Sequence, residues 1–185
     1  MRIIVLLALL STACSAASPL PSERDRSGDR SISARGRAID GDTVSFDVRL
    51  FGADAFERKQ LCRGQSGCWQ CGKAAQDYAA RVLKSGDATI ELTGKQSYGR
   101  PVGTVSVRGR DLGETMIEAG FAVPATSFLK NDPDRASRYV AAYDRALKAR
   151  AGAHASYFLD PAKWRHGERL SCEARSREDQ DSQGR

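Results

Sequence analysis

Acidic side chains and one arginine lie close together in residues 39–57, which read I-D-G-D-T-V-S-F-D-V-R-L-F-G-A-D-A-F-E. Arg49 carries a planar guanidinium, which suits a phosphate because it donates two parallel hydrogen bonds. Asp42 precedes this arginine, and Asp54 and Glu57 follow it. Carboxylate oxygens are the ligands that hard cations prefer, so the segment predicts metal-assisted phosphodiester chemistry.

Strands on both sides of a turn are expected to position these groups. Apolar and polar residues alternate over 32–38, and Asp40 with Gly41 forms a pair typical of a hairpin turn. Residues 44–50 alternate again, with the apolar side chains on one face and Arg49 on the other. We therefore expect strands on both sides of this turn, with Asp42 and Asp54 at one end of a sheet.

The later part of the chain alternates between short strands and helices. Residues 72–85 carry an apolar stripe at helical spacing, Asp111 can cap a short helix, and Asp132 with Pro133 can begin a third. Short alternating segments at 88–92 and 102–107 predict further strands. The order indicates an α+β domain, in which a small closed barrel is one way to hide the sheet edges.

The N-terminus predicts export from the cytoplasm. Residues 1–17 combine Arg2, an apolar run and then small residues, as a signal peptide does, and the run is too short to span a bilayer. The L-L-S-T-A-C segment resembles a bacterial lipobox, which makes Cys14 a candidate for lipidation and membrane anchoring. Cleavage after Ala16 or Ala17 is the alternative, and either route makes the chain extracytoplasmic, in the periplasm, secreted or lipid-anchored.

The composition of the chain after residue 17 predicts a tether, a domain and a tail. Residues 18–31 have almost no apolar content and predict a disordered tether, residues 32–166 hold the domain, and residues 167–185 form a mostly disordered tail. Lys and Arg outnumber Asp and Glu by 29 to 23, which favours polyanionic partners. The chain has only 2 histidines, which leaves few candidate residues for a His-rich zinc site or for Ser-His-Asp or Cys-His catalysis.

The cysteines of the predicted domain and tail suit two disulfides, because an exported chain meets an oxidising compartment. The candidates are Cys62, Cys68, Cys71 and Cys172. The C-W-Q-C spacing at 68–71 is also typical of a thiol oxidoreductase, although no βαβ unit precedes it. A four-cysteine zinc site is a third option.

Three motifs in order resemble the thermonuclease family, the staphylococcal-nuclease-like domain. They are D-G-D-T at 40–43, R-L-F-G-A-D-A-F-E at 49–57 and Y-G-R at 98–100, and the E-A-G-F-A run at 118–122 and P-A-K-W-R at 161–165 agree with the same order. The resemblance implies a five-stranded OB-fold β-barrel with three helices. It also implies a calcium-dependent nuclease that hydrolyses DNA and/or RNA, and we expect a monomer.

The resemblance assigns a role to each site residue. Asp42 and Asp54 would bind calcium, together with the main-chain carbonyl of Ala55. Arg49 and Arg100 would contact the scissile phosphate and stabilise the charge that grows on it in the transition state.

Two further roles follow from the same resemblance. Glu57 would orient or deprotonate the attacking water. Tyr98 would lie near a neighbouring phosphate.

The chain also departs from the family pattern. Phe56 stands where a proline usually precedes the glutamate, and residues 44–48 leave little room for a hairpin that family members commonly fit there. Thr126 and Phe128 stand where the best-known member has tyrosines, which weakens a base-stacking platform. A catalytically inactive nucleic-acid-binding domain is therefore the alternative function, and a thiol oxidoreductase that uses Cys68 and Cys71 is a second.

Overall fold

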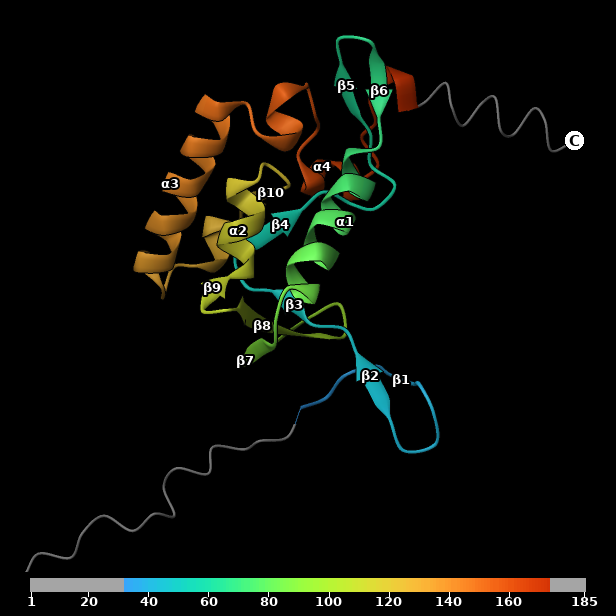
Figure 1. Cartoon of the computed structure of the whole chain (residues 1–185), viewed down its shortest axis with the longest axis vertical. Helices are drawn as coiled ribbons and strands as arrows, with labels where there is room; N and C mark the ends of the chain where they lie inside the picture. The colour runs from blue at the N-terminus through green and yellow to red at the C-terminus, as the bar shows by residue number, and fades with distance from the viewer. Residues whose placement is uncertain (1–31, 174–185) are drawn as a thin grey trace, which may run out of the picture. The chain divides into compact units, whose positions relative to one another are not determined.

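The structure is a computed structural model that describes residues 32–173, and its elements confirm the α+β class (Figure 1). The strands are β1 (Gly36–Ala38), β2 (Val44–Phe46), β3 (Arg49–Leu50), β4 (Ala53–Ala55), β5 (Cys62–Gly64), β6 (Gly67–Trp69), β7 (Ala88–Ser97), β8 (Arg100–Val107), β9 (Arg110–Asp111) and β10 (Ala122–Pro124). The α-helices are α1 (Cys71–Lys84), α2 (Leu112–Glu118), α3 (Pro133–Ala149) and α4 (Pro161–Arg165), and the 3₁₀ turns are η2 (Thr126–Phe128) and η3 (Gly152–Ala155).

The predicted signal segment, Cys14, the tether at 18–31 and residues 174–185 lie outside the described residues, so these remain predictions. Among the residues that the structure describes, no helix is long and apolar enough to cross a bilayer.

The strands pair in several small sheets. Among the described strands, β7 and β8 form the longest antiparallel pair, β3 joins β8 in parallel, and β9 pairs with the end of β8 in antiparallel orientation. β4 pairs with β10, β5 with β6, and β1 with β2. Within residues 32–173 these pairings do not close a barrel, so the five-stranded barrel remains a prediction.

The backbone conformation of the connection after β2 explains why the N-terminal hairpin has no third strand. β2 ends at Phe46 and β3 begins at Arg49, so only Asp47 and Val48 separate the two strands. Neither residue has the positive φ that a two-residue hairpin turn requires, so β2 does not turn back onto β3, and β3 pairs with β8 instead. Among the described strands, β1 and β2 pair only with each other.

The predicted helix starts are confirmed by their caps. The Asp111 carboxylate accepts a hydrogen bond from the Glu114 amide at 2.8 Å, and the Asp132 carboxylate accepts one from the Arg135 amide at 3.1 Å. The Asp160 carboxylate caps the short helix α4 by accepting a hydrogen bond from the Ala162 amide at 2.8 Å. Sequence periodicity missed α4 because five residues are too few for an apolar stripe to repeat.

The core lies between the helices and the short β4–β10 ladder. Ile117 of α2 and Tyr139 of α3 are almost completely buried, and a Cβ on Gly113 would overlap the Tyr139 hydroxyl. That hydroxyl donates to Asp111 at 2.8 Å, and burial raises the pKa of Tyr139. Helices α2 and α3 can therefore pack this closely only because position 113 has no side chain.

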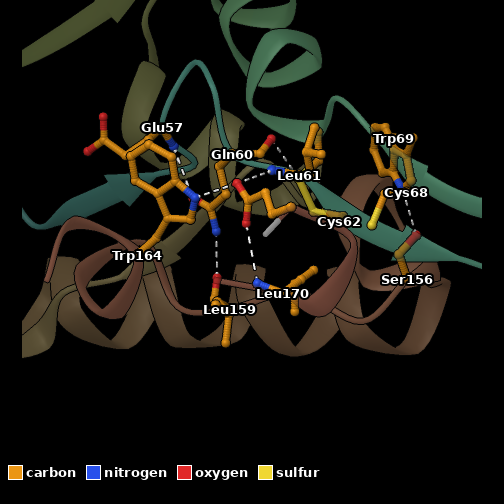
Figure 2. Close-up of a disulfide and its surroundings, with 12 residues drawn as sticks. Glu57, Gln60, Leu61, Cys62, Cys68, Trp69, Ser156, Leu159, Trp164 and Leu170 are labelled. Atoms are coloured by element: carbon orange, nitrogen blue, oxygen red, sulfur yellow. Dashed lines mark hydrogen bonds between the residues drawn. A yellow bond between two sulfur atoms is a disulfide. The ribbon is translucent and has the colours of Figure 1, made fainter. Parts of the chain in front are cut away.

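The cysteines pair across the C-W-Q-C motif instead of within it. Cys62 of β5 bonds to Cys71 at the start of α1, and Cys68 of β6 bonds to Cys172. Figure 2 shows Cys62 and Cys68 with the residues around them. Both motif cysteines therefore have partners outside the motif, which does not support a thiol oxidoreductase.

The described chain continues to Glu173, beyond the domain boundary expected at 166. Leu170 is buried, and the buried Glu173 carboxylate accepts hydrogen bonds from the Leu61 amide at 3.2 Å and the Trp164 indole at 2.6 Å. Together with the bridge to Cys68, these contacts fasten residues 166–173 to the domain.

The two bridges are expected to differ in their effect on stability. Their sequence separations are 9 and 104, so the chain-entropy relation gives about 2.6 kcal/mol for Cys62–Cys71 and about 4.7 kcal/mol for Cys68–Cys172. Replacing both cysteines of one bridge by serine, followed by denaturant unfolding, measures each contribution. A larger loss of unfolding free energy from the Cys62–Cys71 pair would contradict this order.

Candidate functional site

Arg49 and Asp54 meet across the tight turn between β3 and β4. The Arg49 Nη2 atom lies 3.3 Å from the Asp54 Oδ1 atom, and the two side chains are only 21% and 13% exposed. Gly52 in the turn has φ +74°, and a Cβ there would overlap Leu129. Asp54 is also held through its backbone, because it pairs with Val123 of β10.

A second arginine, Arg165, reaches both carboxylates from α4. Its Nη1 atom donates to Asp54 Oδ1 and to Glu57 Oε1, each at 2.9 Å, and its Nη2 atom donates to Asp54 Oδ2 at 2.6 Å. The hydrogen bond to Asp54 is the main interaction that raises the pKa of Arg165. Asp54 therefore lies between two guanidinium groups.

The backbone of Glu57 is fixed by a buried amide that the sequence did not reveal. Gln60 is fully buried; its Oε1 atom accepts from the Glu57 amide at 3.1 Å, and its Nε2 atom donates to the Leu159 carbonyl at 2.7 Å (Figure 2). A Cβ on Gly72 would overlap the Glu57 carbonyl oxygen, so α1 packs directly on this loop. A single polar residue in a loop belongs to no repeating pattern, and its second partner, Leu159, is distant in sequence.

Phe56 anchors the loop where the family usually has proline. Its ring is 5% exposed and meets Phe158 edge to face, with 4.9 Å between ring centroids. Its amide also donates to the Phe121 carbonyl at 3.3 Å, which a proline could not do. Burial of the aromatic ring thus replaces the rigidity that proline would supply.

The Y-G-R motif forms the turn between β7 and β8. Tyr98 and Gly99 have φ 52° and 73°, the left-handed conformation that a two-residue hairpin turn requires at both positions. Tyr98 is 84% exposed, and Arg100 begins β8 opposite Ser97.

Arg49 and Arg100 share one face of the sheet. Arg49 pairs with Val102 across the parallel β3–β8 ladder, and Arg100 precedes Val102 by two positions on β8. Because side chains alternate along a strand, Arg100 lies on the same face as Val102 and hence as Arg49. The structure shows no carboxylate paired with Arg100 among residues 32–173.

Asp42 is not brought to Asp54, contrary to the expectation from the sequence. It lies in the exposed turn of the β1–β2 hairpin, which stands apart from β4 in Figure 1. Its hydrogen bonds are local: Thr43 Oγ1 donates to its carboxylate at 3.1 Å, and its amide donates to Asp40 at 3.3 Å. The backbone conformation at Asp47 and Val48 is the physical reason, because neither residue has the positive φ of a two-residue turn and β3 pairs with β8 instead of β2.

Calcium fits part of this donor set. Asp54 and Glu57 supply hard oxygen atoms, and the cationic Arg165 guanidinium already bridges them. Ala55, whose carbonyl the family resemblance implies as a further ligand, ends β4 directly after Asp54. Among residues 32–173, however, no three acidic, histidine or cysteine side chains gather closely enough to hold a metal ion.

A cavity of about 140 Å³ opens beside Arg49 and Asp54. Lys95 and Ser97 from β7 line it, and Phe128, with its side chain 67% exposed, lies at the same cavity. Basic groups beside an exposed ring suit an anionic ligand that also carries a flat ring.

The comparison with known families agrees with the motifs. A family model described as staphylococcal nuclease homologue matches residues 47–155, which is more than half of the 185 residues. The match includes Arg49, Asp54, Glu57 and Arg100, whereas Asp42 and Arg165 lie outside it. No curated protein matches the chain. The chain belongs to the family of staphylococcal nuclease homologues.

Proposed function

We propose that the chain is a calcium-dependent nuclease that hydrolyses phosphodiester bonds of DNA and/or RNA. The observation that carries the proposal is the cluster of Arg49, Asp54 and Glu57 within the family match, with Arg100 on the same sheet face as Arg49. Opposite charges that lie this close together, beside a cavity, suit a substrate that carries negative charge and a reaction that moves a proton.

Calcium would be held by Asp54, the Ala55 carbonyl and Asp42, and it would supply positive charge at the scissile phosphate. The proposed fold around this site is the five-stranded OB-fold barrel of the family.

Arg49 and Arg100 bind the scissile phosphate in this proposal. Arg49 is held in place by Asp54 and by Ser97, whose hydroxyl oxygen accepts from Arg49 Nη1 at 3.5 Å. Arg100 has its donors available for the phosphate, since no carboxylate among the described residues pairs with it. Both guanidinium groups stabilise the charge that grows on the phosphate oxygens in the transition state.

Glu57 orients or deprotonates the attacking water. Its side chain is 37% exposed, which leaves it open to solvent, and Gln60 fixes the backbone that carries it. Tyr98 and Phe128 are exposed and would contact a neighbouring phosphate and a base.

The setting of the enzyme is also proposed. The two disulfides support an extracytoplasmic location, because such bonds persist in oxidising compartments. We propose that the exported chain is a monomer, with an N-terminal lipid at Cys14 or ordinary signal cleavage.

An inactive nucleic-acid-binding domain is the second candidate function. It is favoured by the place of Asp42, whose contacts lie within its own turn, away from the other carboxylates.

The assay that separates the two functions uses the purified mature protein with plasmid and single-stranded DNA. We expect digestion with calcium and none with a chelator, because the negatively charged reacting centre needs the added positive charge. Binding of DNA without digestion at any calcium concentration would instead support the inactive domain.

Asp42→Ala tests whether the exposed turn belongs to the metal site. If Asp42 is a calcium ligand, calcium affinity falls and cleavage collapses, because one anionic ligand of a hard cation is lost. Calorimetric calcium titration and turnover measure both effects, with Asp144→Ala, which removes an exposed carboxylate on α3 outside the proposed site, as the matched control. Unchanged calcium dependence in the Asp42→Ala protein would remove this residue from the proposed site.

Arg100→Ala tests the phosphate contact. The change leaves every carboxylate in place and removes a donor to transition-state charge, so turnover should fall about 100-fold with calcium affinity unchanged. Arg145→Ala, on α3 and paired with Glu118, is the matched control for loss of one surface arginine. Equal turnover in the two variants would contradict the role of Arg100.

A further inference from the structure

Arg165 makes more contacts to the acidic pair than any other described side chain. It binds both oxygens of Asp54 and one oxygen of Glu57, whereas Arg49 reaches one oxygen of Asp54 at the longer distance of 3.3 Å. The Arg165 side chain is 29% exposed and that of Asp54 is 13% exposed, so water screens this pair only in part. Arg165 is therefore the main positive charge on these carboxylates.

Several contacts hold this arginine in place from behind. Helix α4 is capped by Asp160, and the next residue back from Arg165, Trp164, donates to the buried Glu173. The Arg169 guanidinium lies 3.9 Å from the centre of the Trp164 ring. The Cys68–Cys172 bridge then fastens the end of the segment to β6.

A hard cation and the Arg165 guanidinium would compete for the same atoms. Both would use the Asp54 oxygens, and the two positive charges would repel each other at that distance. Glu57 has a different relation to Arg165, because its other oxygen is not bonded to it. Arg165 can therefore release Asp54 and still direct the Glu57 carboxylate.

We propose that Arg165 is a positioning residue that acts as a built-in counter-ion: it holds Asp54 and Glu57 in place without calcium, yields Asp54 to the cation and keeps Glu57 aimed. This inference rests on the proposed nuclease function and deepens it, because it gives the C-terminal segment a part in the same site. It also explains why a segment outside the family match is fastened by a disulfide and a buried carboxylate.

The test is calcium titration of the mature protein by calorimetry, combined with kcat and KM on single-stranded DNA. In Arg165→Ala, calcium affinity should rise about 10-fold or more because the competing cation is gone, and kcat should fall about 10-fold or more because Glu57 loses its direction. KM should change little, because Arg165 does not contact the substrate. Arg165→Lys, which keeps the charge, should lie between the two.

Lys163→Ala is the matched control, because Lys163 is an exposed cation on the same helix and forms no ion pair with Asp54 or Glu57 among the described residues. It should leave calcium affinity and kcat at the wild-type values. If Arg165→Ala melts too early to titrate, Arg165→Lys and Arg165→Gln replace it in the calcium measurement.

Calcium affinity that is unchanged or weaker without Arg165 would overturn the proposal, as would the absence of calcium binding in every protein. A raised KM with normal calcium affinity would also overturn it and would make Arg165 a phosphate ligand. A wild-type protein that binds calcium without cleaving DNA would instead refute the proposed function, and a rise in affinity in Arg165→Ala would still support the counter-ion.

Discussion

The carboxylate of Asp54, held between Arg49 and Arg165, is the interaction on which the site depends. A half-buried anion is costly unless it is paired, and here both oxygens have guanidinium partners. Different elements place the two arginines: Arg49 lies just before the Gly52 turn, and Arg165 lies at the end of helix α4. The backbone of Asp54 is fixed by its pairing with Val123 of β10.

The positions of Arg165 and Glu57 depend in turn on the disulfides and on the buried Glu173. Cys68–Cys172 and the hydrogen bonds of Glu173 fasten the residues after α4, so Arg165 is held from both sides of its helix. Cys62–Cys71 joins β5 to the start of α1, where Gly72 packs on the Glu57 carbonyl. The two bridges thus flank the loop that carries Glu57, and they restrain it without contacting the carboxylate.

Local signals in the sequence predicted local structure. Asp111 and Asp132 cap their helices because a cap needs only residues within one turn. The sequence placed Arg49 and Asp54 in one short segment, and the structure pairs them across the turn between β3 and β4. Gln60 and Arg165 were missed, because Gln60 links Glu57 to the distant Leu159 and Arg165 pairs with the distant Asp54, and no periodicity records such contacts. Family resemblance assigned no role to either.

The position of Asp42 follows from the small amount of apolar surface that its hairpin buries. Val44 is 73% exposed and Ile39 67%, and among the described strands β1 and β2 pair only with each other. A two-stranded hairpin without a packed face is only marginally stable, so little burial energy fixes its orientation on the domain. Asp47 and Val48 link the hairpin to β3, and a change of backbone angles at these two residues would move Asp42 without breaking any buried contact. The short connection therefore leaves the carboxylate of Asp42 out of the described cluster, and it leaves the core that holds Asp54 and Glu57 unchanged.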